Sequence, residues 1–115
     1  MKRAVRLRLH DITEAIDGIE STVAGMTFAQ YVQSWRTRRA VERGIEIISE
    51  ASRHIPDELK ERHPHIYWRE IAAIGNLLRH EYGRIDDRIM WRVVEKYLPE
   101  LKMAVTDMLR SISGT

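Results

Sequence analysis

The chain has 115 residues, of which 43% are hydrophobic and 31% are charged, so it can form one globular domain and is too apolar to be disordered. It contains no cysteine, which excludes disulfide frameworks, cysteine nucleophiles and thiolate metal sites. The net charge is +2 and the pI is about 9.1, a balance that permits contact with nucleic acid without requiring it. No apolar run is long enough to cross a bilayer. We expect a single domain over residues 1–115, in the cytoplasm.

The first predicted helix covers residues 2–24, because apolar residues recur there at steps of three and four. These residues are Val5, Leu9, Ile12, Ile16, Ile19 and Val23. Gly25 follows where a C-terminal cap is expected.

The second predicted helix runs from residue 27 to about residue 53. Thr27 and Gln30 have the spacing of a capping box at its start. The apolar positions of this segment include Phe28, Tyr31, Val32, Trp35, Val41, Ile45 and Ile48. Gly44 lies in its interior, where a missing side chain favours the close approach of another helix.

Prolines divide the middle of the chain. Pro56 ends the second helix and begins a short one over residues 56–62, and Pro64 closes it. A third long helix is predicted over residues 66–81, with Gly83 as its stop.

The last helix is predicted to begin near Asp86–Asp87, and Pro99 should kink or split it near Tyr97–Leu98. No segment alternates with a period of two for long enough to predict a strand. The predicted fold is therefore all-α, an up-and-down bundle of four main helices with one extra short helix.

Two groups of polar residues suggest metal sites, but neither has a sufficient ligand pattern. His63 and His65 flank Pro64 with His54 nearby, which provides no fixed third ligand, so a solvated loop is favoured. Glu42, Glu46 and Glu50 follow one another at intervals of one turn, without the Glu-x-x-His pattern of carboxylate bundles. We predict no metal site, and expect these glutamates to form ion pairs with neighbouring arginines. The arginines are Arg39, Arg43 and Arg53.

The third long helix carries the most distinctive cluster. Asn76 and His80 are four residues apart and share a helix face, and Arg79 adjoins His80. Tyr82 follows at the helix end, before Gly83. Such side chains can transfer a proton and hold a phosphate, although His80 could equally be a hydrogen-bonded interface residue.

This stretch resembles the signature of the HepT-like proteins of the HEPN superfamily. The signature reads Arg-Asn, three residues, His, one residue, Tyr, and a Trp-Arg-x-Ile pattern precedes it. The matching residues here are Trp68–Arg69–Glu70–Ile71–Ala72, Asn76, His80 and Tyr82. Shorter matches extend the resemblance over nearly the whole chain. They include Thr27–Phe28, Glu50–Ala51, Pro56–Asp57–Glu58–Leu59–Lys60, Asp86, Trp91 and Leu98–Pro99–Glu100–Leu101.

The resemblance implies a helical bundle that forms a homodimer, with a shared cleft between the His-bearing helices. Active members resemble metal-independent endoribonucleases that need no cofactor. They are toxins of type VII-like toxin–antitoxin pairs, whose partner is a minimal nucleotidyltransferase (MntA-like) antitoxin. That antitoxin can attach AMP to the motif tyrosine, which corresponds to Tyr82. The catalytic positions implied here are His80 and Asn76, with Glu50 as a supporting residue.

One departure from the signature bears directly on catalysis. The motif arginine, which should hold the scissile phosphate, falls at Gly75. Arg79 lies one turn further on, about 5–6 Å along the axis, and is the catalytic cation we expect to stand in.

Three interpretations stay open. The first is a weakened ribonuclease that acts on RNA, and the second is an inactive nucleotidyltransferase-partner subunit that binds nucleotide or RNA. The third is a structural dimer of unrelated function, which would be favoured if residues 80–82 were buried inside one protomer.

Overall fold

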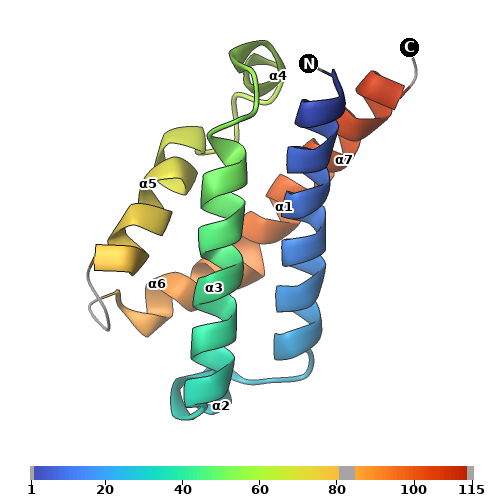
Figure 1. Ribbon diagram of the computed structural model, residues 1–115. Coiled ribbons are helices and arrows are strands. Elements are labelled where there is room, and N and C mark those ends of the chain that lie inside the picture. Colours follow the sequence, from blue (N-terminus) through green and yellow to red (C-terminus); the bar gives the residue numbers. More distant parts are fainter. Residues whose placement is uncertain (1, 81–84, 114–115) are drawn as a thin grey trace.

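The computed structural model describes residues 2–80 and 85–113, and within these ranges the chain forms helices and no strand (Figure 1). The helices are α1 (Lys2–Val23), α2 (Phe28–Gln33), α3 (Trp35–Ser52), α4 (Asp57–Glu61), α5 (Trp68–His80), α6 (Asp87–Arg92), the π-helical segment η1 (Val93–Tyr97) and α7 (Leu98–Ser113). The all-α bundle predicted from the sequence is confirmed. None of the described helices is both long and apolar enough to span a membrane.

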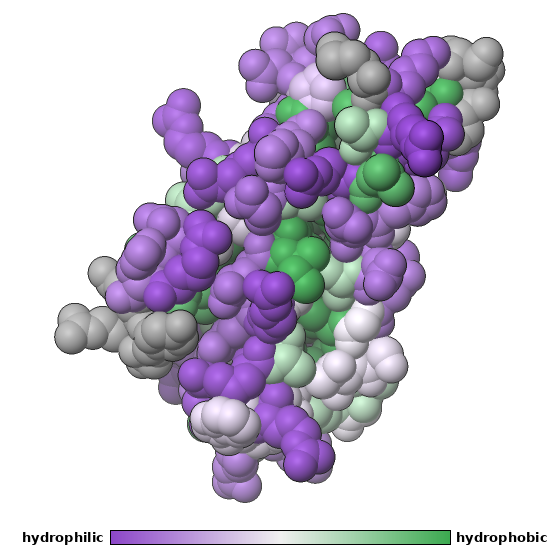
Figure 2. All heavy atoms as spheres, viewed as in Figure 1, coloured by the Kyte–Doolittle hydropathy of each residue, from purple (hydrophilic) through white to green (hydrophobic). Residues whose placement is uncertain are grey.

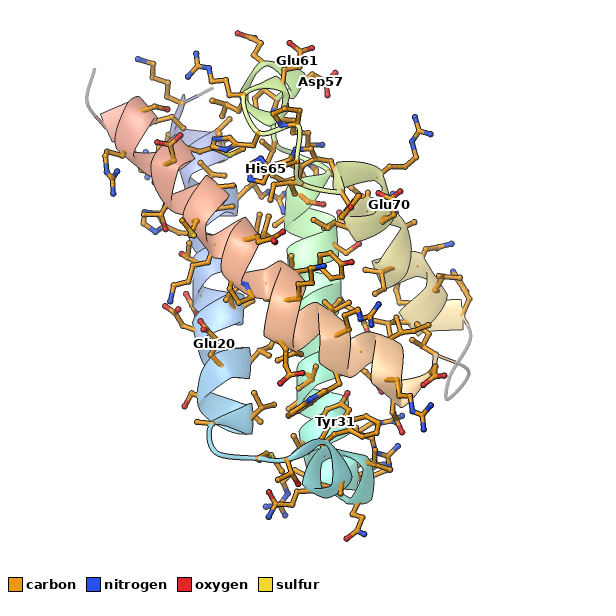
Figure 3. The ribbon with its side chains drawn as sticks, turned by 180° about the vertical axis from the view of Figure 1, so that it is seen from behind. Glu20, Tyr31, Asp57, Glu61, His65 and Glu70 are labelled. Atoms are coloured by element: carbon orange, nitrogen blue, oxygen red, sulfur yellow. The ribbon has the colours of Figure 1, made fainter. Side chains whose placement is uncertain are left out.

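Helix α3 lies at the centre of the arrangement. Helix α1 packs along one side of α3 and α5 along the other (Figure 1). The elements α6, η1 and α7 follow one another without a loop, and we call them the C-terminal helix. It crosses behind α1 and α3, as the view from the back shows (Figure 3).

The core consists largely of the apolar stripes predicted from the sequence. Leu9, Ile12 and Ile16 of α1 have no exposed surface. Helix α1 approaches α3 closely at Gly44, as predicted. A Cβ atom on Gly44 would lie 2.7 Å from Cδ1 of Ile19, so any side chain there would force Ile19 to shift. From α3 and the C-terminal helix come Val41, Ile45, Ile48, Met90, Val94, Leu101, Val105 and Met108.

The prediction of one helix from residue 27 to residue 53 is wrong, because the chain breaks at Ser34. Ser34 has an extended backbone, with φ −100° and ψ 97°, and its Oγ accepts a hydrogen bond from the backbone N–H of Thr37 at 3.2 Å. It therefore caps α3, as serine commonly does at a helix start. The break lets Tyr31 enter the core while Trp35 stays 66% exposed. The capping box of Thr27 and Gln30 is present as predicted.

The helix is not split near Pro99, which was one of the two predicted outcomes, because a π-helical segment leads directly into α7. The backbone N–H of Leu98 donates to the carbonyl oxygen of Val93, five residues earlier. Proline cannot donate a helical hydrogen bond, and its ring crowds the carbonyl group of the preceding turn. The wider turn of a π-helix accommodates the missing hydrogen bond and the ring without ending the helix. The C-terminal helix can therefore pass across the whole bundle.

Tyr31 joins α2 to the C-terminal helix. Its side chain is fully buried, and its ring lies 5.1 Å from that of Trp91, centroid to centroid (Figure 3). Burial raises the pKa of the Tyr31 hydroxyl well above its usual range, and the carboxylates of Asp87 and Glu42 raise it further. Tyr31 therefore stays protonated in the folded protein at pH values where a free tyrosine ionises.

We expect this raised pKa to set an alkaline limit on stability. The unfolded chain releases the Tyr31 proton near pH 10, and the folded chain releases it only at higher pH, so stability is complete below about pH 10 and falls above it. Tyr31→Phe should move the alkaline unfolding midpoint, followed by circular dichroism, to higher pH. Tyr67→Phe is the matched control because Tyr67 is 57% exposed. Equal midpoints for Tyr31→Phe and the native chain would contradict this.

Candidate functional site

Helix α5 carries the motif residues and is held at its start by Trp68. The indole Nε1–H of Trp68 donates to the carbonyl oxygens of Lys60, at 3.2 Å, and His63, at 3.1 Å. These bonds fasten the start of α5 to the segment around α4. At the opposite end, the described part of α5 reaches His80, and the next four residues, which include Tyr82, lie outside the described part of the chain.

Ser49 fixes the crossing of α3 and α5. Its side chain is buried, and its Oγ donates to the carbonyl oxygen of Ala72 at 3.0 Å and accepts from the backbone N–H of Gly75 at 3.2 Å. A Cβ atom on Gly75 would lie 2.5 Å from Oγ and 2.7 Å from Cβ of Ser49. Real Cβ atoms do not approach other atoms so closely, so position 75 has no room for a side chain while α3 and α5 cross here.

Asn76, Arg79 and His80 are all exposed. Asn76 and His80 share the outward face of α5, as their spacing predicted, and Arg79 follows Gly75 by one turn on the side toward α3. None of the three side chains forms a hydrogen bond or ion pair with another described residue. His80 is not packed inside the protomer, so the condition that would have favoured a purely structural dimer is not met at this residue.

Glu50 does not join this group through any contact with a described residue of α5. It is 51% exposed, and its Oε1 lies 3.3 Å from Nε2 of His54, just beyond the end of the same helix. The face of α1, α3 and α5 seen in Figure 2 is mostly hydrophilic, with a few hydrophobic side chains showing along the helices. Glu50 is thus an exposed residue of α3, next in sequence to the crossing residue Ser49.

The ion pairs predicted along α3 are confirmed for two of the three arginines. Arg39 Nη2 lies 3.3 Å from Glu42 Oε2, and Arg43 Nη1 lies 3.6 Å from Glu46 Oε2. Partial burial raises the pKa of Glu42, although Arg39 works against that shift.

The pairing predicted for Arg53 is wrong. Its Nη2 donates instead to the carbonyl oxygen of Ala72 on α5, at 2.6 Å. Ser49 was thus missed in the sequence, and Arg53 was assigned to an ion pair instead of to its contact with α5. The available signal was a serine at a core-facing position of α3.

The described residues contain no group of three or more histidine, aspartate or glutamate side chains that could hold a metal ion. The expectation of a solvated His63–His65 loop holds for His65, which is exposed. It is wrong for His63, whose side chain is only 12% exposed and whose Nε2 lies 3.1 Å from Oδ2 of Asp107 on α7. The two rings are 6.0 Å apart, centroid to centroid.

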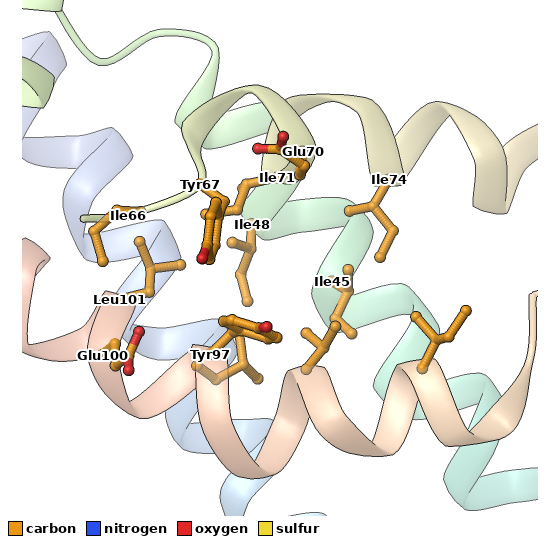
Figure 4. A pocket seen from close by; sticks show the side chains of 13 residues that line it. Ile45, Ile48, Ile66, Tyr67, Glu70, Ile71, Ile74, Tyr97, Glu100 and Leu101 are labelled. Carbon is orange, nitrogen blue, oxygen red and sulfur yellow. The ribbon is translucent and has the colours of Figure 1, made fainter. Parts of the chain in front are cut away.

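A hollow of about 380 Å³ opens on another face of α5, between α5 and the C-terminal helix (Figure 4). Its walls are mainly isoleucine, and the rings of Tyr67 and Tyr97 meet there edge to face at 5.6 Å. Among the described residues, the charged side chains that line it are the carboxylates of Glu70 and Glu100. An apolar hollow with negative groups does not suit an anionic substrate, so we place the candidate site on the outward face of α5.

The chain matches the family model described as ribonuclease HepT-like over residues 12–108. It belongs to the HepT-like family. Among curated relatives, a probable ribonuclease HepT of Thermococcus cleftensis is 41% identical over 102 residues, covering 89% of this chain and 93% of the relative. A putative RNase of Methanocaldococcus jannaschii is 33% identical over 104 residues, covering 90% of this chain and 95% of the relative. A putative RNase of Caldanaerobacter subterraneus is 34% identical over 102 residues, covering 89% of this chain and 91% of the relative. No solved structure matches the chain significantly.

The Ser49–Gly75 contact predicts opposite effects for alanine at two helical glycines. Gly75→Ala should lower the free energy of unfolding by about 1–3 kcal/mol, because its Cβ would overlap Ser49. Gly18→Ala is the control, since a Cβ there meets nothing within 4 Å, and it should raise that free energy by roughly 0.5–1 kcal/mol. Urea denaturation measures both. Adding Ser49→Gly to Gly75→Ala should recover part of the loss, whereas equal stabilisation by both alanines would rule out the close contact.

Proposed function

We propose that this HepT-like protein is a metal-independent endoribonuclease whose catalytic residues are His80, Asn76 and Arg79. The supporting observation is the exposed face of α5, which presents Asn76 and His80 together with Arg79 at its edge. Membership in the HepT-like family and relatives named as ribonucleases favour RNA as the substrate.

The proposed reaction needs only protein side chains and the ribose of the substrate. Neutral His80 takes the proton of a ribose 2′-hydroxyl, and the 2′-oxygen attacks the adjacent phosphorus. The bond from phosphorus to the 5′-oxygen breaks, and protonated His80 returns its proton to that oxygen. The products are a 2′,3′-cyclic phosphate and a free 5′-hydroxyl, so no water is consumed and no cofactor takes part.

The other residues act on charge and orientation. The negative charge that develops on the phosphoryl oxygens needs a nearby cation, and Arg79 is the motif residue that offers one. Asn76, one turn before His80, can orient the imidazole or the phosphate. Glu50 is a supporting residue, since it lies next to Ser49 on the helix that positions α5.

We further propose that the site is completed by a second copy of the chain. The outward face of α5 is open in one protomer, and the described hollow lies elsewhere. Leu77 on α5 is 46% exposed and Ala73 is small and exposed, which allows two α5 helices to pack closely. Such a homodimer would place two copies of Asn76 and His80 around one cleft.

The biological role that fits this enzyme is a cytoplasmic toxin of a type VII-like toxin–antitoxin pair. Its partner would be a minimal nucleotidyltransferase (MntA-like) antitoxin that modifies Tyr82 with AMP. The second candidate is an inactive nucleotidyltransferase-partner subunit that binds nucleotide or RNA. The observation that favours it is Gly75, where the family signature has an arginine.

His80→Ala tests the enzyme. Purified native chain should cleave single-stranded RNA in EDTA and leave cyclic phosphate ends, while His80→Ala should lose at least about 10²-fold in rate because it lacks the general base. His10→Ala is the control, since His10 is an exposed histidine on α1. RNA that is bound but left intact by the native chain would favour the inactive partner subunit.

Leu77→Lys tests the dimer. A charged side chain on the outward face of α5 should repel its symmetry-related copy and leave the protein monomeric in sedimentation equilibrium. Met103→Lys is the control, because Met103 is 74% exposed on α7, away from that face. If Leu77→Lys keeps the mass of the native assembly, copies of α5 do not meet through this face.

A further inference from the structure

Arg53 is joined to the glycine at the motif-arginine position by a short chain of hydrogen bonds. The N–H of Gly75 donates to Oγ of Ser49, and this hydroxyl donates to the carbonyl oxygen of Ala72. The same carbonyl oxygen accepts the 2.6 Å bond from Nη2 of Arg53. A guanidinium from α3 is therefore fastened at the part of α5 where Gly75 leaves no side chain.

The charge of Arg53 is not neutralised by another described residue. Arg39 and Arg43, on the same helix, are each paired with a glutamate. Arg53 is exposed, and its one partner among the described residues is a neutral carbonyl group. A guanidinium has five N–H donors and stays charged at all working pH values, so most of its donors can still bind an anion.

Arg53 also lies at the level of the motif residues. In an α-helix the carbonyl oxygen of residue 72 points toward the N–H of residue 76, at roughly 3 Å. A group that is hydrogen-bonded to that carbonyl oxygen is therefore close to the backbone N–H of Asn76, one turn before His80. A phosphate held there would lie at the edge of α5 that faces α3, next to the outward face on which we place the reaction.

We propose that Arg53 is a phosphate-binding residue of the RNA site and supplies the cation that position 75 lacks. This proposal rests on the proposed ribonuclease function. Two observations favour Arg53 for this role. Position 75 is closed to any side chain by Ser49, and Arg53 is held close to the backbone N–H of Asn76 before substrate arrives. Arg79 then acts one turn further along, near His80.

Substitution of Arg53 by glutamine tests the proposal by binding and by cleavage. Binding uses a single-stranded RNA with 2′-O-methyl riboses, which cannot be cleaved because the attacking hydroxyl is blocked. Arg53→Gln should reduce the slope of log affinity against log salt by about 0.7, the value for one phosphate contact on a single strand. Cleavage of unmodified RNA should fall by about 10²-fold, as for loss of one donor to a developing charge.

Three further variants separate charge from structure. Arg43→Gln removes an exposed arginine of α3 that is already paired with Glu46. It should keep the native salt slope and a cleavage rate within about 2-fold of the native rate. Ser49→Ala removes hydrogen bonds of the same crossing without removing a charge, and should leave the salt slope unchanged. Arg53→Lys keeps the charge, and should retain the native salt slope even if Arg53→Gln does not fold.

The outcomes distinguish this proposal from the ribonuclease function. If the native chain cleaves RNA through His80 while Arg53→Gln and Arg43→Gln behave alike, Arg53 holds no phosphate and the ribonuclease function stands. If the native chain cleaves no RNA, the ribonuclease function fails. Phosphate binding by Arg53 is then decided by whether Arg53→Gln has a lower salt slope than the native chain. An Arg53→Lys salt slope as low as that of Arg53→Gln would also overturn the proposal.

Discussion

The hydrogen-bonded contact between Ser49 and Gly75 is the constraint on which the arrangement of the site depends. A single buried hydroxyl donates to Ala72 and accepts from Gly75, so turning or sliding α5 along α3 would leave the buried Ser49 hydroxyl without these two partners. The missing Cβ of Gly75 brings the helices close enough for both bonds. With α5 fixed in this way, Asn76 and His80 face outward and the isoleucines of α5 face the C-terminal helix.

This contact also changes what the glycine in the motif means. In the sequence it reads as a lost phosphate-binding side chain, whereas in the folded chain it is a packing position. An arginine at position 75 would have to displace Ser49 or lift α5 from α3. Cations for an anionic substrate therefore have to come from neighbouring positions. Arg79 on α5 and Arg53 on α3 are exposed and unpaired with any described carboxylate.

Much of the fold was predictable because a helix that packs on one side has apolar residues that recur every three or four positions. The stripes of α1, α3 and the C-terminal helix and the cap at Thr27 all depend on residues within one or two turns. The break at Ser34 was missed because apolar residues continue on both sides of it, at Tyr31 and Trp35. Only the folded chain shows that the first of these is buried and the second exposed.

The sequence by itself determined the all-α class, the HepT-like resemblance and the common face of Asn76 and His80, because a four-residue spacing is enough to place two side chains together on a helix. The tertiary structure decided why position 75 is glycine and where Arg53 points. Ser49 and Gly75 are 26 residues apart, and Arg53 and Ala72 are 19 apart. Contacts across such separations depend on how two helices cross, and the local pattern of either helix does not specify that crossing.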